Sequence, residues 1–242
     1  MPILSAFGAG RTIPAVGGGI VDGEYSYDFD GSSSFTYPAS SSFAIGTQEF
    51  SIECFVYLDT TPATSATILD FGYGTGSSQP QRIQFYINSS RQPVFVRNNY
   101  PTSSSSTLVT SSIAVSLSTW TYIAATRNSS GVVRVFVGSS SGGSATISGT
   151  ITSGSVVTPS VGNGTVQTTR FLDGKISNLR FNIGSGSGFS SATVPTSPLA
   201  PVATTKMLTC QSSTIKDNSV ANGGGPWTLT NSGVLVSTSS PF

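Results

Sequence analysis

Apolar and polar residues alternate along most of this chain. The clearest case is FSIECFVYL at residues 50–58, where every second residue from Phe50 to Leu58 is apolar and Glu53 lies on the opposite face. Such alternation is typical of a strand with one face in a core, so we predict a central strand whose Phe50 face lies between two sheets. Similar segments predict further strands at 25–29, 66–72, 82–88, 92–98, 120–128, 132–138, 144–151, 171–181, 207–211 and 227–237.

Residues 171–181, FLDGKISNLRF, do not alternate cleanly. Phe181 and the charged Lys175 share one parity, whereas Ile176 and the charged Arg180 share the other. Both faces of this strand therefore carry apolar side chains. That pattern is typical of a strand enclosed inside a sandwich.

Turn residues separate these segments at intervals of about ten residues, and no apolar stripe of helical period occurs. The spacing predicts an all-β fold, a two-layer antiparallel sandwich, with helix limited to a turn at 190–192. No linker interrupts residues 24–242, so we expect one domain there. The glycine-rich residues 1–23 are interpreted either as an arm that orders along a partner or as a leader along the domain's own edge.

Three segments carry a resemblance to a known family: WTYIAATRN at 120–128, VVRVFVG at 132–138, and residues 171–181. Together they resemble the laminin-G-like, concanavalin A-like lectin/glucanase superfamily, which implies a jelly-roll sandwich. In that family a late strand has the form Phe-x-Gly-x-Ile-x-x-Leu-Arg. Here two residues separate Phe171 from Gly174, so the match either begins one residue early or contains a bulge.

The segments 197–219 and 236–242 resemble the C-terminal part of sandwich domains in virion proteins of marine tailed bacteriophages, and this resemblance extends over residues 24–242. It implies a non-enzymatic protein of the virion surface: a head decoration protein, a head fibre or part of a tail fibre. Its partners would be other virion proteins of the capsid or tail, and a cell-surface glycan. It would act by adhesion or capsid docking, as a homo-oligomer or bound to a lattice. The alternative is a cellular carbohydrate-binding lectin domain.

The charge balance excludes one class of partner. Only 9% of residues are charged, the net charge is +1, and the Lys and Arg residues are scattered. Nucleic-acid binding needs clustered basic residues that displace counterions, so we expect none. No apolar run is long enough to span a membrane and no secretion signal is recognisable. Release by host lysis would then bring the protein outside the cell.

Catalytic residues are scarce. The chain has no histidine, which removes the commonest general base and histidine-assisted nucleophiles. Some relatives in the resembling superfamily are glucanases with a Glu-x-Asp-x-x-Glu motif. The Glu residues here do not form that motif, so we expect no enzymatic activity; they are Glu24, Glu49 and Glu53.

Glu53 is the only acidic residue in a strongly apolar strand. A buried carboxylate is usually paired, so we expect a structural ion pair with Arg127 or Arg180. We also expect the side chains of Trp120 and Phe181 to be buried in the core. Cys54 and Cys210 should be buried as well, as free thiols that form no disulfide.

Two segments offer chemistry suited to glycans. Aromatic rings stack on the C–H face of a sugar, while amides bind its hydroxyl groups. The segment RNNYPT supplies Asn98, Asn99 and Tyr100, and the segment GYGTGSSQPQR supplies Tyr73. These four residues form the predicted ligand site, although exposed Tyr and Asn are also ordinary loop residues.

No cofactor is predicted, apart from a weak possibility of Ca²⁺. Relatives of this type hold Ca²⁺ on loop carboxylates and carbonyls. No Asp-x-Asp-x-Asp-Gly loop occurs here, but Asp70 or Asp173 could contribute to one site.

Overall fold

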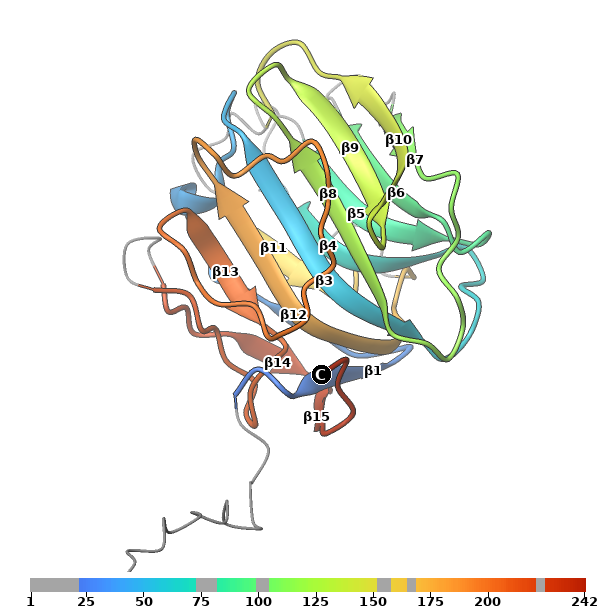
Figure 1. Cartoon of the computed structure of the whole chain (residues 1–242). Coiled ribbons are helices and arrows are strands. Elements are labelled where there is room, and N and C mark those ends of the chain that lie inside the picture. The colour runs from blue at the N-terminus through green and yellow to red at the C-terminus, as the bar shows by residue number, and fades with distance from the viewer. Residues whose placement is uncertain (1–21, 73–81, 99–104, 152–157, 165–168, 221–224) are drawn as a thin grey trace, which may run out of the picture.

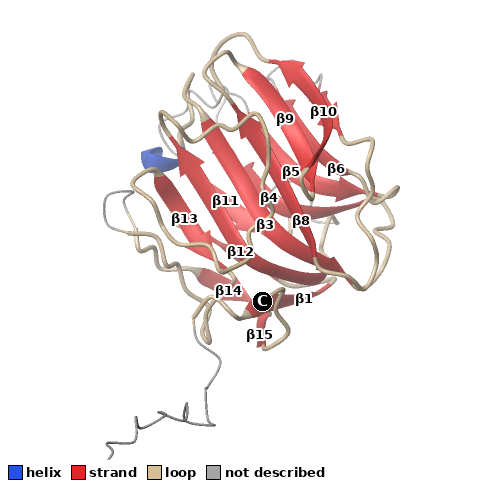
Figure 2. Ribbon diagram, viewed as in Figure 1, coloured by secondary structure: helices blue, strands red, loops and turns tan. Residues whose placement is uncertain are grey.

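The computed structural model describes residues 22–72, 82–98, 105–151, 158–164, 169–220 and 225–242. Within them the chain forms two antiparallel sheets packed as a sandwich, which confirms the predicted all-β fold (Figure 2). The helical turn expected at 190–192 is absent, and those residues are irregular. The helix in the described part is η1 (Ser41–Phe43), capped by the Ser40 side chain. No helix in these ranges is long and apolar enough to cross a membrane.

The first sheet has eight strands (Figure 1). Seven follow one path and β13 (Thr205–Thr209) pairs with one of them, β12. The path runs β10 (Ser140–Thr146), β9 (Val132–Val137), β8 (Thr121–Arg127), β3 (Phe50–Leu58), β12 (Asp173–Ile183), β1 (Ser26–Asp30) and β15 (Leu235–Ser237). The pairing of β1 with β15 joins the two terminal parts of the domain, as expected for such a sandwich.

The second sheet has seven strands. Their order is β14 (Thr230–Ser232), β2 (Ser34–Thr36), β11 (Thr158–Val161), β4 (Ser65–Gly72), β5 (Arg82–Asn88), β6 (Pro93–Asn98) and β7 (Ser105–Thr110). The ranges of β3 and β5 agree with the prediction to the residue. The strand expected at 144–151 lies earlier, as β10, because it forms a hairpin with β9 directly after Gly138.

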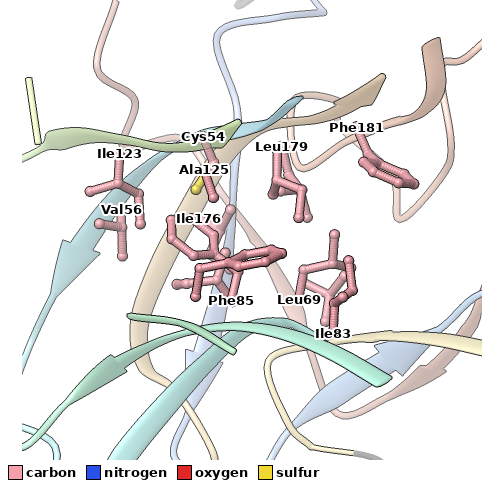
Figure 3. Close-up of a cluster of buried hydrophobic side chains, with 14 of the residues drawn as sticks. Cys54, Val56, Leu69, Ile83, Phe85, Ile123, Ala125, Ile176, Leu179 and Phe181 are labelled. Carbon is pink, nitrogen blue, oxygen red and sulfur yellow. The ribbon is translucent and has the colours of Figure 1, made fainter. Parts of the chain in front are cut away.

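Side chains from both sheets meet in one core (Figure 3). Those labelled there have no exposed surface and come from β3, β8 and β12 on one side and from β4 and β5 on the other. They are Cys54, Val56, Leu69, Ile83, Phe85, Ile123, Ala125, Ile176, Leu179 and Phe181. Burial of this continuous apolar layer is the main force that holds the two sheets together.

Three of the four side chains expected to be buried are confirmed. Cys54 and Cys210 are free, buried thiols, and burial raises the pKa of both. Phe181 is fully buried. The expectation for Trp120 is wrong: its residue precedes β8, and its half-buried ring packs on the outside of the sheet, 5.5 Å from the ring of Tyr57.

A bulge in β12 explains the mixed pattern of this strand. Its register with β3 shifts by one residue at Asn178, which has φ of 55°. Asn is one of the few residues with a side chain that tolerates this left-handed conformation. The extra residue reverses the parity, so that Ile176 and Leu179 both face the core and Arg180 faces outward beside Glu53. This bulge lies after Gly174, so it does not account for the extra residue between Phe171 and Gly174.

The start of the domain is tied to its C-terminal half. The Gly23 N–H donates to the carbonyl of Gln211 over 2.5 Å, and Lys216 lies 2.8 Å from the carboxylate of Asp22. Residues 1–21, most of the predicted arm, lie outside the described residues. Docking of the arm on a partner therefore stays a prediction.

Replacement of Phe181 by Ala should lower the free energy of unfolding by about 3–5 kcal/mol, because it leaves a cavity in a core that cannot fully collapse. Leu235, with 68% of its surface exposed on the edge strand β15, is the matched control. Leu235→Ala should change stability by less than about 0.5 kcal/mol. Chemical denaturation of both variants checks this, and equal effects would show that the core is misplaced.

Candidate functional site

The predicted ligand site is only partly described. Asn98 ends β6, where its backbone pairs with Arg82 and Ser105. Tyr73, Asn99 and Tyr100 lie outside the described residues. Asn98 therefore belongs to the end of the seven-stranded sheet, and the site as a whole stays a prediction.

A polar chain lies on the outer face of that same sheet. Gln84 in β5 donates to the carboxylate of Asp70 in β4 over 3.2 Å and accepts from the guanidinium of Arg170 over 3.3 Å. Arg170 also lies 5.3 Å from the centre of the Tyr86 ring. Asp70 is fully buried, and the bond from Gln84 gives its carboxylate a hydrogen-bond donor.

The two carboxylates considered for Ca²⁺ are not brought together. Asp70 belongs to the seven-stranded sheet, whereas Asp173 begins β12 of the other sheet and accepts from the Thr60 hydroxyl over 2.6 Å. Among the described residues, no group of three or more His, Cys, Asp or Glu is arranged to hold a metal. A Ca²⁺ site at either residue stays a prediction.

The described residues form a pocket on the outer face of the eight-stranded sheet. Its volume is about 340 Å³. Strands β3, β8 and β12 supply Ser51, Glu53, Tyr122, Arg180 and Asn182. The segment 184–204 connects β12 to β13 and crosses this face (Figure 1). It forms the roof of the pocket, which is rich in hydroxyl groups and includes Phe189. We call this cavity the outer pocket.

An ion pair forms part of the pocket floor. One carboxylate oxygen of Glu53 accepts from Nε and Nη2 of Arg180, over 3.0 and 2.9 Å. The other accepts from the hydroxyl of Tyr122 over 2.8 Å. Burial, and then the charge of Glu53, raise the pKa of Tyr122, so its hydroxyl remains a donor. Arg180 is therefore the predicted partner of Glu53, whereas Arg127 instead donates to backbone carbonyls of residues 46, 147 and 149.

A second polar group lies beside this pair. Asn182 donates to the hydroxyl of Ser51 over 3.0 Å and accepts from the hydroxyl of Thr205 over 2.7 Å. Ser187 faces the same pocket, and its hydroxyl is buried without a hydrogen-bond partner among the described residues. An unsatisfied buried hydroxyl of this kind costs stability unless another molecule bonds to it.

The segment that forms the roof is held at several points. Thr126 of β8 donates to the carbonyl of Phe189 over 2.8 Å, and Ala192 packs on the outer apolar cluster around Phe55. Gly188 lies so close to the backbone of Arg127 that a Cβ atom would overlap its carbonyl oxygen. Glycine is therefore required for this approach. The segment has no hydrophobic period, and this is why the sequence alone did not predict the pocket.

Asn178 connects the β12 bulge to the roof. Its side-chain oxygen accepts from the Leu199 N–H over 2.8 Å, and its Nδ2 donates to Gly23 and to Ser177, over 2.9 and 2.8 Å. The guanidinium of Arg180 adds a bond to the carbonyl of Ala200 over 2.7 Å. The same bulge therefore orients the floor and holds the end of the roof.

Comparison with known proteins identifies the family of the chain and structures with a similar fold. Residues 29–182 match the family model of the concanavalin A-like lectin/glucanases superfamily. No curated protein sequence matches the chain. Among solved structures, a Bacteroides ovatus protein whose description proposes carbohydrate binding aligns with TM-score 0.54 and 13% identity, over 88% of this chain and 59% of that one.

Two further structures are similar. Domain 4 of AbnA, an extracellular GH43 arabinanase of Geobacillus stearothermophilus solved with arabinotriose, aligns with TM-score 0.51 and 17% identity, over 66% of this chain and 70% of that one. The CBM40 of the Ruminococcus gnavus IT-sialidase aligns with TM-score 0.51 and 14% identity, over 67% of this chain and 92% of that one. At these identities the likeness shows a shared fold.

Asn178→Ala should lower the free energy of unfolding by about 2–4 kcal/mol, because it leaves buried partners unbonded and places Ala in a left-handed conformation. Asn178→Gly is the matched control, since glycine tolerates that backbone but makes none of the side-chain bonds. Its loss of stability should be smaller. Urea denaturation measures both, and wild-type stability of Asn178→Ala would contradict the role of the bulge.

Proposed function

The chain belongs to the concanavalin A-like lectin/glucanases superfamily, and from this premise we propose that it is a non-catalytic glycan-binding domain. Its sugar site is the outer pocket, between the eight-stranded sheet and the segment 184–204. The structural relatives support binding of carbohydrates, because they include an arabinanase domain solved with arabinotriose and a sialidase carbohydrate-binding module.

One observation carries the proposal: the outer pocket combines a polar floor and an unbonded hydroxyl on Ser187 with an aromatic wall. Once the Ser187 side chain turns toward the pocket, a ligand hydroxyl would satisfy its hydroxyl, which is buried and unbonded in this structure. The ring of Phe189 offers an apolar surface to the C–H face of a sugar. The volume of about 340 Å³ lies in the usual range for small-ligand sites.

The pocket chemistry supports binding without hydrolysis. Glycoside hydrolysis generally uses two carboxylates on opposite sides of the scissile bond. Glu53 is the one carboxylate among the residues that line the outer pocket. Arg180 bonds to one of its oxygens and Tyr122 to the other. An engaged, ion-paired carboxylate is poorly placed to act as acid, base or nucleophile.

Phe189→Ala should weaken glycan binding by about tenfold, because the stacking surface is lost. Screening the wild type on a glycan array identifies a ligand, and calorimetry then measures its affinity for each variant. Phe242→Ala is the matched control: Phe242 packs on Phe55, in the outer cluster, but does not line the pocket.

The same titration separates the outer pocket from the loop site predicted from the sequence. Tyr73→Ala and Tyr100→Ala should leave the affinity unchanged. If they abolish binding while Phe189→Ala has no effect, the glycan site belongs to those loops instead.

We further propose a location for the domain. The resemblance of segments 197–219 and 236–242 to phage proteins supports a place on the virion surface, as a head or tail component that is homo-oligomeric or bound to a lattice. A cellular lectin is the alternative. Mass spectrometry of purified particles should detect this chain among the structural proteins, whereas its recovery only from a cellular fraction would favour the alternative.

A further inference from the structure

We infer that the outer pocket selects neutral sugars and rejects sugars that carry a carboxylate, because Glu53 both neutralises Arg180 and occupies its binding edge. This specificity presupposes the glycan-binding role proposed above. It names the class of ligand that the same site would accept.

The charges around the pocket balance without a ligand. Glu53 and Arg180 are the charged residues among those that line it, and their closest atoms lie 2.9 Å apart. The other polar lining groups are hydroxyls and the Asn182 amide. A ligand carboxylate would therefore meet no uncompensated positive charge there, and it would have to lose its water shell.

The geometry of Arg180 also works against an acidic ligand. A guanidinium binds a carboxylate best through two parallel N–H bonds. The edge formed by Nε and Nη2 is already bonded to Glu53, and Nη1 donates to the carbonyl of Ala200. Within the described residues, three of the five N–H groups of Arg180 are thus engaged, so a ligand carboxylate would find only one unbonded N–H on each of Nη1 and Nη2.

A second negative charge lies next to the roof. One carboxylate oxygen of Glu49 accepts from the backbone N–H of Gly188 over 3.3 Å. Gly188 lies between Ser187 and Phe189, two residues that line the pocket. Like charges repel more strongly where water is partly excluded, so Glu49 adds to the rejection of anionic sugars.

Neutral sugars meet none of these penalties. Their hydroxyl groups both donate and accept hydrogen bonds. This suits the unbonded hydroxyl of Ser187 and the hydrogen-bonding capacity that the Asn182 amide has left. Their C–H faces suit Phe189. Affinity built on such contacts should depend little on ionic strength.

The test uses a glycan array with matched pairs of neutral oligosaccharides and their sialylated or uronic-acid counterparts. The wild type should prefer the neutral member of each bound pair by about tenfold or more. Glu53→Gln keeps the shape of the side chain but leaves Arg180 unneutralised. It should shift the ratio by about tenfold toward the carboxylated member.

A second variant keeps the test valid if Glu53→Gln does not fold. Thr193 lies exposed on the pocket rim, so Thr193→Lys adds a positive charge without disturbing the core. It should also shift the ratio toward carboxylated sugars, and this shift should disappear in high salt. Melting temperatures confirm that each variant is folded.

The outcomes separate the two proposals. Pocket-dependent binding that favours carboxylated sugars in the wild type overturns the neutral specificity alone. Equal loss of both sugar classes in Glu53→Gln, with no shift in Thr193→Lys, also overturns it, since the ion pair would then be only structural. If no glycan binds, or if binding ignores Phe189→Ala, the proposed function itself fails, and the specificity fails with it.

Discussion

The single extra residue in β12 is the constraint on which the rest of the arrangement depends. A strand in a sandwich has only two faces, and shifting it by one residue exchanges them. The bulge at Asn178 makes this exchange in the middle of β12. Apolar side chains before and after it therefore face the core, and Arg180 comes to lie beside Glu53 on the outside.

Both faces of the eight-stranded sheet are consequently covered. The inner face belongs to the main core, while the outer face carries a smaller apolar cluster around Phe55 and Tyr122, against which the segment 184–204 packs. The ion pair at the edge of that cluster is weak evidence for stability, because desolvation offsets much of its attraction. In the proposed function, this pair in the pocket floor fixes the charge and the donors that a sugar would meet.

The strands were predictable where alternation is strict, as in β3 and β5, because the two-residue period is a direct consequence of strand geometry. Short strands such as β2 and β11 have too few residues for a period to appear. The partner of Glu53 was predictable because a buried carboxylate requires one. The outer pocket was not, since its roof is an aperiodic segment positioned by contacts with residues distant in sequence, such as Thr126 and Asn178.

The most direct test of this account is a nuclear magnetic resonance titration of the ¹⁵N-labelled domain with the tightest neutral glycan found on the array. Ligand binding in the outer pocket should shift the amide signals of Gly186, Ser187 and Phe189, which line it. The signals around Asn98, at the end of the other sheet, should stay unchanged. Shifts confined to the surroundings of Asn98, with the signals of residues 184–204 unaffected, would contradict the account.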